Sequence, residues 1–146
     1  MSDTDAMRPR PAADADSRPF WEACAREELL GQRCGQCGVW RWPPRRHCPH
    51  CHAADPVWQG LPGTGKVAGF TVVHRAMDPA FAEEIPLAIV HVELDGTGGE
   101  MVLMSNLQAG EWEHVRVGSP VTVLFRRLNH ETALPLFTLR NTTTKE

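Results

Sequence analysis

Apolar side chains recur at roughly helical spacing just before residue 30, at Phe20, Trp21, Cys24 and Leu29. Ser17 and Pro19 suit the first positions of a helix, and Gly31 suits its end. We therefore expect a short amphipathic helix that runs from about residue 17 to Gly31. Because three turns of helix are marginal alone, it should pack on a neighbouring part, with Cys24 as a buried thiol.

Beyond residue 60 the pattern changes to short runs rich in apolar and β-branched residues, separated by Gly, Pro or Asn. They predict five strands, at 66–74, 87–94, 100–107, 121–128 and 134–141. The glycines of "DGTGGE", residues 95–100, supply the positive φ angles of a hairpin turn between the second and third strands. Five short antiparallel strands fit a small barrel such as the OB-fold, although a small sandwich has the same periodicity.

The chain divides into three parts on this pattern. Residues 1–18 mix Ala, Asp, Pro and Arg without an apolar period, as in a disordered tail. Residues 19–60 hold the helix and a cysteine-rich module, and "GLPGTG", residues 60–65, is turn material that marks the boundary. Residues 61–146 are the expected OB-fold domain. The fold class is therefore mainly β, with a helix and a metal ribbon ahead of a barrel.

Charge and composition restrict the classes of function that we expect of this chain. A net charge of −3 over 146 residues gives no general attraction to nucleic acid. No apolar run spans a bilayer and the first residues lack the apolar stretch of a secretion signal, so we expect a cytoplasmic protein without membrane contact. In that reducing compartment, paired cysteines favour metal ligation over disulfides.

Four of the five cysteines form two C-x-x-C pairs, which are Cys34 with Cys37 and Cys48 with Cys51. Two such knuckles enclose a tetrahedral metal ion, as in zinc ribbons and rubredoxin. Gly38 can adopt the unusual backbone angles of the first knuckle. Zinc is favoured because it is the usual structural ion of four thiolates; iron would make an electron carrier, but nothing else in the chain indicates a redox partner.

A complete set of four thiolates argues against catalytic zinc, because no coordination position stays open for water or substrate. Three histidines lie next to the second pair in the sequence: His47, His50 and His52. We expect them on the surface or around the cysteine ligands, without a bond to the metal. The chain also lacks a nucleophile motif, a phosphate-binding glycine loop and an H-E-x-x-H helix. We expect no autonomous catalysis.

Six further residues are candidates for a ligand or partner surface: Trp40, Trp42, Arg45, Arg46, His74 and Arg75. The first four lie in "VWRWPPRRH", residues 39–47, where aromatic rings and guanidinium groups could stack on a nucleobase, an adenine-bearing cofactor or a protein. The same loop equally fits a small aromatic core with arginines outside. His74 and Arg75 end the first barrel strand and could meet an anion, or form a solvated rim.

The helix "PFW", the four-cysteine ribbon with "PPRRHCPHC" and the strand "GKVAGFTVVHRA" together resemble a family first catalogued as a domain of unknown function. That family joins a rubredoxin-like zinc ribbon to an OB-fold and is associated with acyl-CoA metabolism. The resemblance runs from about Pro19 onward.

The resemblance implies a non-catalytic subunit that forms a hetero-oligomer with a thiolase-fold acyl-CoA enzyme, a thiolase or retro-aldolase. Structural Zn²⁺ and a CoA thioester, shared with the partner, are the implied ligands. The alternative is a module that binds single-stranded nucleic acid, since OB barrels and zinc ribbons both recur there. The acidic charge argues against that alternative.

Overall fold

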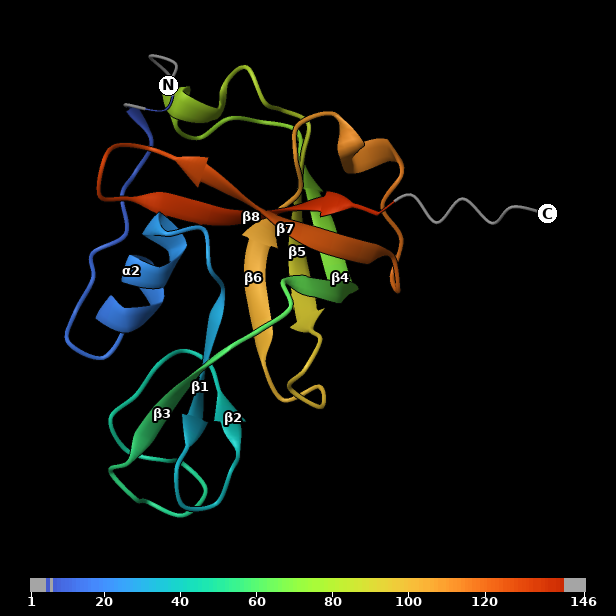
Figure 1. Ribbon diagram of the computed structural model, residues 1–146. Helices are drawn as coiled ribbons and strands as arrows, with labels where there is room; N and C mark the ends of the chain where they lie inside the picture. The colour runs from blue at the N-terminus through green and yellow to red at the C-terminus, as the bar shows by residue number, and fades with distance from the viewer. Residues whose placement is uncertain (1–4, 6, 141–146) are drawn as a thin grey trace.

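The computed structural model describes residues 5 and 7–140 of the chain. Helix α2 (Arg18–Ala25) is followed by a small antiparallel sheet of order β2-β1-β3, made by β1 (Leu30–Cys34), β2 (Trp40–Arg41) and β3 (Pro56–Gly60). Figure 1 shows this sheet at one end of the molecule, with α2 between it and the hairpin of the last two strands. Among all the described residues, no helix has the length and apolar content needed to cross a bilayer.

The second sheet has five antiparallel strands in the order β6-β5-β4-β7-β8. They are β4 (Thr64–Val73), β5 (Leu87–Leu94), β6 (Val102–Asn106), β7 (Pro120–Arg127) and β8 (Ala133–Leu139). A parallel bridge between Leu107 and Phe137 brings the two edges together, so the sheet nearly closes. This order and closure are those of an OB-like barrel, which confirms the predicted fold class. Two single-turn helices, η1 (Pro79–Phe81) and η2 (Glu111–Glu113), lie in its connections.

The five predicted strands are those observed, within two residues at each end, except that Asn141 lies outside the described residues. The hairpin at "DGTGGE" is confirmed, because β5 and β6 are paired across it. Gly96, Gly98 and Gly99 all have positive φ there, at 90°, 62° and 82°. Thr97 is buried in the turn, where its hydroxyl donates to the Leu94 carbonyl at 2.8 Å.

The predicted helix end was wrong. Helix α2 ends at Ala25, and Gly31 lies inside strand β1. Glu27 adopts a left-handed conformation at φ 62°, and the amides of Glu27 and Glu28 donate backward to the carbonyls of Cys24 and Ala23. This is a Schellman cap, which usually carries glycine. Because Glu rather than Gly holds that position, no residue type marks the end of the helix.

One apolar core joins the helix, the small sheet and the barrel. Phe20 and Cys24 of α2 and Trp40 of β2 belong to the same buried cluster as the barrel residues Val90, Leu107 and Phe137. Trp42 extends it, with its ring centroid 4.6 Å from that of Phe20. The small sheet is therefore packed against α2 and the barrel, and is not joined to them by the chain alone.

The first described residues also contact the barrel. Asp5 accepts a hydrogen bond from Arg126 Nε at 2.6 Å, and Glu84 pairs with both Arg8 and Arg126. The Arg8 guanidinium lies 4.6 Å from the Phe81 ring centroid. Asp5 and Arg8 therefore lie against the barrel, and the disordered tail expected over residues 1–18 stays a prediction. Ion pairs over such sequence separations leave no local pattern. Residues 1–4 and 6 lie outside the described residues.

Cys24 is buried as expected, and this has a measurable result. Burial raises the pKa of its thiol to about 12, against about 8.5 for an exposed thiol. Since the folded protein holds this proton more tightly than the unfolded chain, the resulting stability is complete below about pH 8.5 and is lost as the pH rises toward 12. Between pH 8 and 10.5, the thermal midpoint should fall more steeply in the parent protein than in Cys24→Ala. Parallel pH profiles would contradict this.

Candidate metal centre

The first cysteine pair sits on a tight knuckle at the end of β1. The Gly38 amide donates to the Cys34 carbonyl at 3.0 Å, and the Cys34 amide donates to the Val39 carbonyl at 2.9 Å. Gly38 makes this turn with φ at 77°, in the left-handed region that glycine adopts without steric cost. The backbone thus turns Cys37 back toward Cys34.

The second pair repeats the same geometry. The His52 amide donates to the Cys48 carbonyl at 2.9 Å, and the Cys48 amide donates to the Ala53 carbonyl at 2.9 Å. His52 holds the position of Gly38, with φ at 66°. The two C-x-x-C segments are therefore structural copies of one another, which is the arrangement that places four sulfur atoms around one point.

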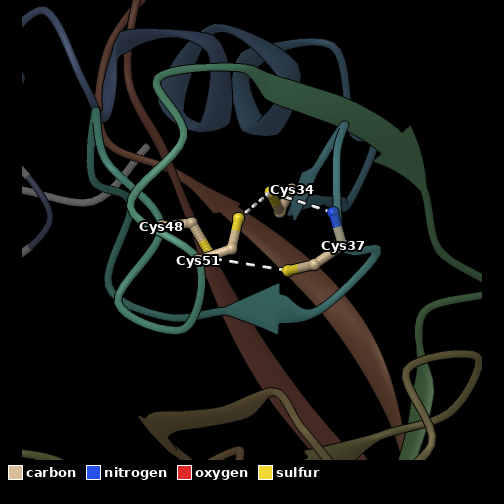
Figure 2. Close-up of side chains that lie close together, drawn as sticks. All are labelled: Cys34, Cys37, Cys48 and Cys51. Carbon is tan, nitrogen blue, oxygen red and sulfur yellow. Dashed lines mark hydrogen bonds between the residues drawn. The ribbon is translucent and has the colours of Figure 1, made fainter.

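All four sulfur atoms converge, as Figure 2 shows, and lie within 4.8 Å of one another. Cys34 Sγ is 3.6 Å from Cys51 Sγ, and Cys37 Sγ is 3.6 Å from Cys48 Sγ. A tetrahedral zinc ion with Zn–S bonds of about 2.3 Å separates its sulfurs by about 3.8 Å. The four thiols are thus positioned to bind a metal ion, and the donor set fits zinc.

Backbone amides support the thiolate form of the two buried cysteines. Hydrogen bonds from the amides of Cys37 and Gln36, both at 3.4 Å, hold the pKa of Cys34 at about 6. Amide donation from Cys51 and His50 likewise lowers the pKa of Cys48. Because metal ligation requires deprotonated sulfur, these amides favour metal binding as well as orienting the side chains.

The three histidines beside the second knuckle are exposed, and none joins the ligand group found among the described residues. His52 has a backbone role instead, because it occupies the left-handed position of the knuckle. Non-glycine residues there are strained, although His tolerates the conformation better than most.

His52→Gly should therefore stabilise the ribbon by about 0.5 kcal/mol, since relief of the left-handed strain slightly exceeds the added entropy of the unfolded chain. Gly38→Ala should destabilise it by about 1 kcal/mol, since its new Cβ meets only ordinary contacts and the backbone strain alone changes. Chemical unfolding of the zinc-loaded variants measures both. Loss of metal from His52→Gly would make His52 a ligand and contradict this assignment.

The two tryptophans of the loop between the knuckles point toward the interior, whereas its arginines at 45 and 46 do not. Trp40 is 7% exposed, and the Arg33 guanidinium lies over its ring at 5.1 Å. Trp42 is half-buried against Phe20. The loop was expected to form either a stacking surface or a small aromatic core, and the placement of these two rings is that of an aromatic core. Arg45 and Arg46 are exposed.

His74 and Arg75 follow β4 and are both exposed, far along the chain from the cysteines. The His74 ring meets the Trp112 ring edge-on at 5.7 Å. Arg75 borders an apolar hollow of about 230 Å³ formed by the 76–81 segment and the ends of β4 and β5. The structure thus separates the six surface candidates into a ribbon group and a barrel group.

Sequence reasoning missed two buried polar residues of the ribbon, Gln32 and Arg41, which are 1% and 4% exposed. Gln32 Oε1 accepts from Arg41 Nε at 2.7 Å and from the Arg45 amide at 2.8 Å. Arg41 Nη2 donates to the Arg45 carbonyl at 2.8 Å. The pair fixes the loop that leads into Cys48. The "WRWPPRR" segment contains several arginines, and nothing local singles out the buried one.

Fold and site together define a protein in which a four-cysteine, rubredoxin-like ribbon precedes an OB-fold barrel. Two family models match in that order: the rubredoxin-like zinc ribbon domain of ChsH2 over residues 21–57 and the C-terminal OB-fold domain of ChsH2 over residues 58–126. The chain belongs to this family, DUF35, as its resemblance predicts.

Two relatives are similar to this chain over most of its length. It is 32% identical to a DUF35 domain-containing scaffold protein of Methanocaldococcus jannaschii, over 70% of this chain and 71% of that protein. It is 36% identical to a probable enoyl-CoA hydratase alpha subunit of Thermomonospora curvata over 90% of this chain, but spans only 40% of that protein.

Solved structures give the same result. A chain of the Ltp2–ChsH2(DUF35) aldolase superposes with a TM-score of 0.78 at 33% identity, covering 89% of this chain and 98% of that one. A DUF35 protein of unknown function from Sulfolobus solfataricus shares the fold, with a TM-score of 0.63 at 16% identity over 88% of this chain and 87% of that one.

Proposed function

We propose that this protein is a non-catalytic, zinc-stabilised subunit that assembles with an acyl-CoA enzyme and supports it. The observation that carries this is the similarity to a chain of the Ltp2–ChsH2(DUF35) aldolase, which extends over 98% of that chain. The relatives described as a scaffold protein and as an enoyl-CoA hydratase alpha subunit point to the same class of role.

The metal in this proposal is Zn²⁺, held by Cys34, Cys37, Cys48 and Cys51. Its contribution is structural, because a fourth thiolate fills the position that a catalytic zinc keeps for water or substrate. The ribbon needs such support, since between the knuckles it has only the two-residue strand β2. A cytoplasmic location follows from the need for free thiols.

The described residues offer no catalytic set of their own. The one cluster of metal-binding side chains found among them is the four-cysteine site. His74 contacts the Trp112 ring rather than a nucleophile. The proposed partner therefore supplies the chemistry.

The finer part of the proposal concerns that partner. A thiolase-fold enzyme, thiolase or retro-aldolase, is the partner that the family resemblance favours, with a CoA thioester as a ligand that the complex shares. Arg45, Arg46, His74 and Arg75 are exposed and remain candidates for the contact surface. Trp40 and Trp42 act from inside by holding the ribbon loop in place. The burial of Trp40 also weakens the support for single-stranded nucleic-acid binding, which needs open stacking faces.

Co-expression with an acyl-CoA aldolase or thiolase from the same host tests the proposal. The purified chain alone should turn over no acyl-CoA substrate, and the two chains together should give an active hetero-oligomer that survives gel filtration. The enzyme purified alone should be less stable or less active. Full activity and stability of the enzyme alone, with no complex formed, would refute the proposal.

A further inference from the structure

Arg41 is a buried cation without a carboxylate partner. Its side chain is 4% exposed, and its hydrogen bonds go to the neutral oxygens of the Gln32 amide and the Arg45 carbonyl. Its Nη1 atom is buried and has no hydrogen-bond partner within the described chain. None of the ion pairs found among the described residues includes Arg41. A buried charge is costly unless an opposite charge lies close by.

The strand register places Arg41 beside the metal site. Arg41 pairs with Gln32 across the β1–β2 ladder, and Cys34 lies two residues beyond Gln32 on the same face of β1. Cys34 is thus the diagonal neighbour of Arg41, at a Cα separation of about 7–8 Å that a long side chain can bridge. The ladder continues through the hydrogen bond from the Cys34 amide to the Val39 carbonyl.

A zinc ion with four thiolates carries a net charge of about −2. Two of those sulfurs belong to buried residues, since Cys34 is 2% and Cys48 is 1% exposed. Solvent and salt therefore screen their charge only weakly. Burying an anionic centre alone costs free energy, and so does burying an unpaired cation. When both lie on one face of the β1–β2 hairpin, each offsets the cost of the other.

We propose that Arg41 is the counter-charge of the metal–thiolate centre, and that Gln32 orients its guanidinium without neutralising it. Arg41 is a positioning residue, which contacts no substrate and acts on the metal through the field at the sulfurs. The inference rests on the zinc site of the proposed function. It explains why a neutral amide, rather than a carboxylate, faces the buried arginine.

The deciding variant is Gln32→Glu in the full-length protein. A carboxylate keeps both acceptor bonds, to Arg41 Nε and the Arg45 amide, but cancels the charge of the guanidinium. Zinc release to a chromogenic chelator at neutral pH should become about 10-fold faster, within the 10- to 100-fold range typical of residues that support metal ligands. In the cobalt-substituted protein, the sulfur-to-cobalt charge-transfer band should move to lower energy. Arg46→Gln removes an exposed arginine of the same loop and should change neither reading.

A second pair of variants covers a Gln32→Glu protein that fails to fold. Arg41→Met should show the faster release and the shifted band, whereas Arg41→Lys, which keeps the charge, should retain a band energy near that of the parent. Parent-like release and band energy in Gln32→Glu, or equal band shifts in Arg41→Met and Arg41→Lys, would overturn the inference. Failure of the zinc proposal is distinct, because the parent protein itself would then hold no metal.

Discussion

Cys48→Ser is expected to abolish tight zinc binding and to unfold the ribbon, rather than to produce a simple defect in rate. In small zinc modules the free energy of metal binding, about 10–16 kcal/mol, is the free energy of folding, and one missing thiolate removes a large share of it. Cys34→Ser should behave in the same way, since the two residues hold equivalent positions in the paired knuckles. Metal analysis and thermal unfolding of the purified variants measure the effect.

The loss should extend beyond the ribbon to complex formation. Trp40 and Trp42 contribute to the core shared with α2 and the barrel, so an unfolded ribbon also exposes Phe20. We expect Cys48→Ser to lose its partner in co-purification. Cys24→Ala is the matched control, because it removes a buried thiol outside the metal site and should keep the parent zinc content. Unchanged stability and zinc content in both serine variants would contradict a structural metal.

Gly65→Ala is expected to destabilise the barrel by about 3 kcal/mol through overpacking. Gly65 lies in β4 between two hydrogen-bonded neighbours, opposite Leu94 of β5 and Val121 of β7. A Cβ at this position would lie 2.5 Å from the Glu93 carbonyl oxygen and 2.7 Å from a Val92 methyl group. Backbone on a paired strand cannot move aside cheaply, so strand pairing must distort.

Gly69→Ala provides the control on the same strand. Gly69 lies at the β-bulge, where an added Cβ meets nothing within 4 Å. It should be neutral or stabilising by about 0.5 kcal/mol, since glycine costs entropy in a strand. Chemical unfolding of both variants gives the comparison. Equal free energies of unfolding for Gly65→Ala and Gly69→Ala would show that the close approach of the strands at Gly65 does not require glycine there.

The barrel could be predicted from the sequence because its strands alternate and are bounded by turn residues. β5, for example, alternates buried and exposed positions from Val90 to Leu94 as its apolar pattern requires. The ribbon strands β1, β2 and β3 could not be predicted. β2 has only two residues, and β1 and β3 lack the run of apolar and β-branched residues that marks the barrel strands. The end of α2 was missed because Glu27, not glycine, makes the turn.

The four-cysteine cluster could be predicted to the residue because its signal is the local spacing of a rare residue type. Burial of neighbouring side chains has no such signal. From the sequence alone, Trp40 could equally have formed a stacking surface, and Arg41 could not be distinguished from Arg45. The structure buries Arg41, which the β1–β2 ladder pairs with Gln32, and leaves Arg45 exposed. Charge partners and core contacts depend on the fold, whereas ligand spacing does not.

The most direct test of the proposed role is to recover tagged protein from its native host, identify co-purifying chains by mass spectrometry, and measure zinc in the same sample. The proposed role predicts one zinc ion per chain together with an acyl-CoA enzyme in defined proportion, and loss of both in Cys48→Ser. Recovery of the chain with bound nucleic acid and without an enzyme partner would contradict it.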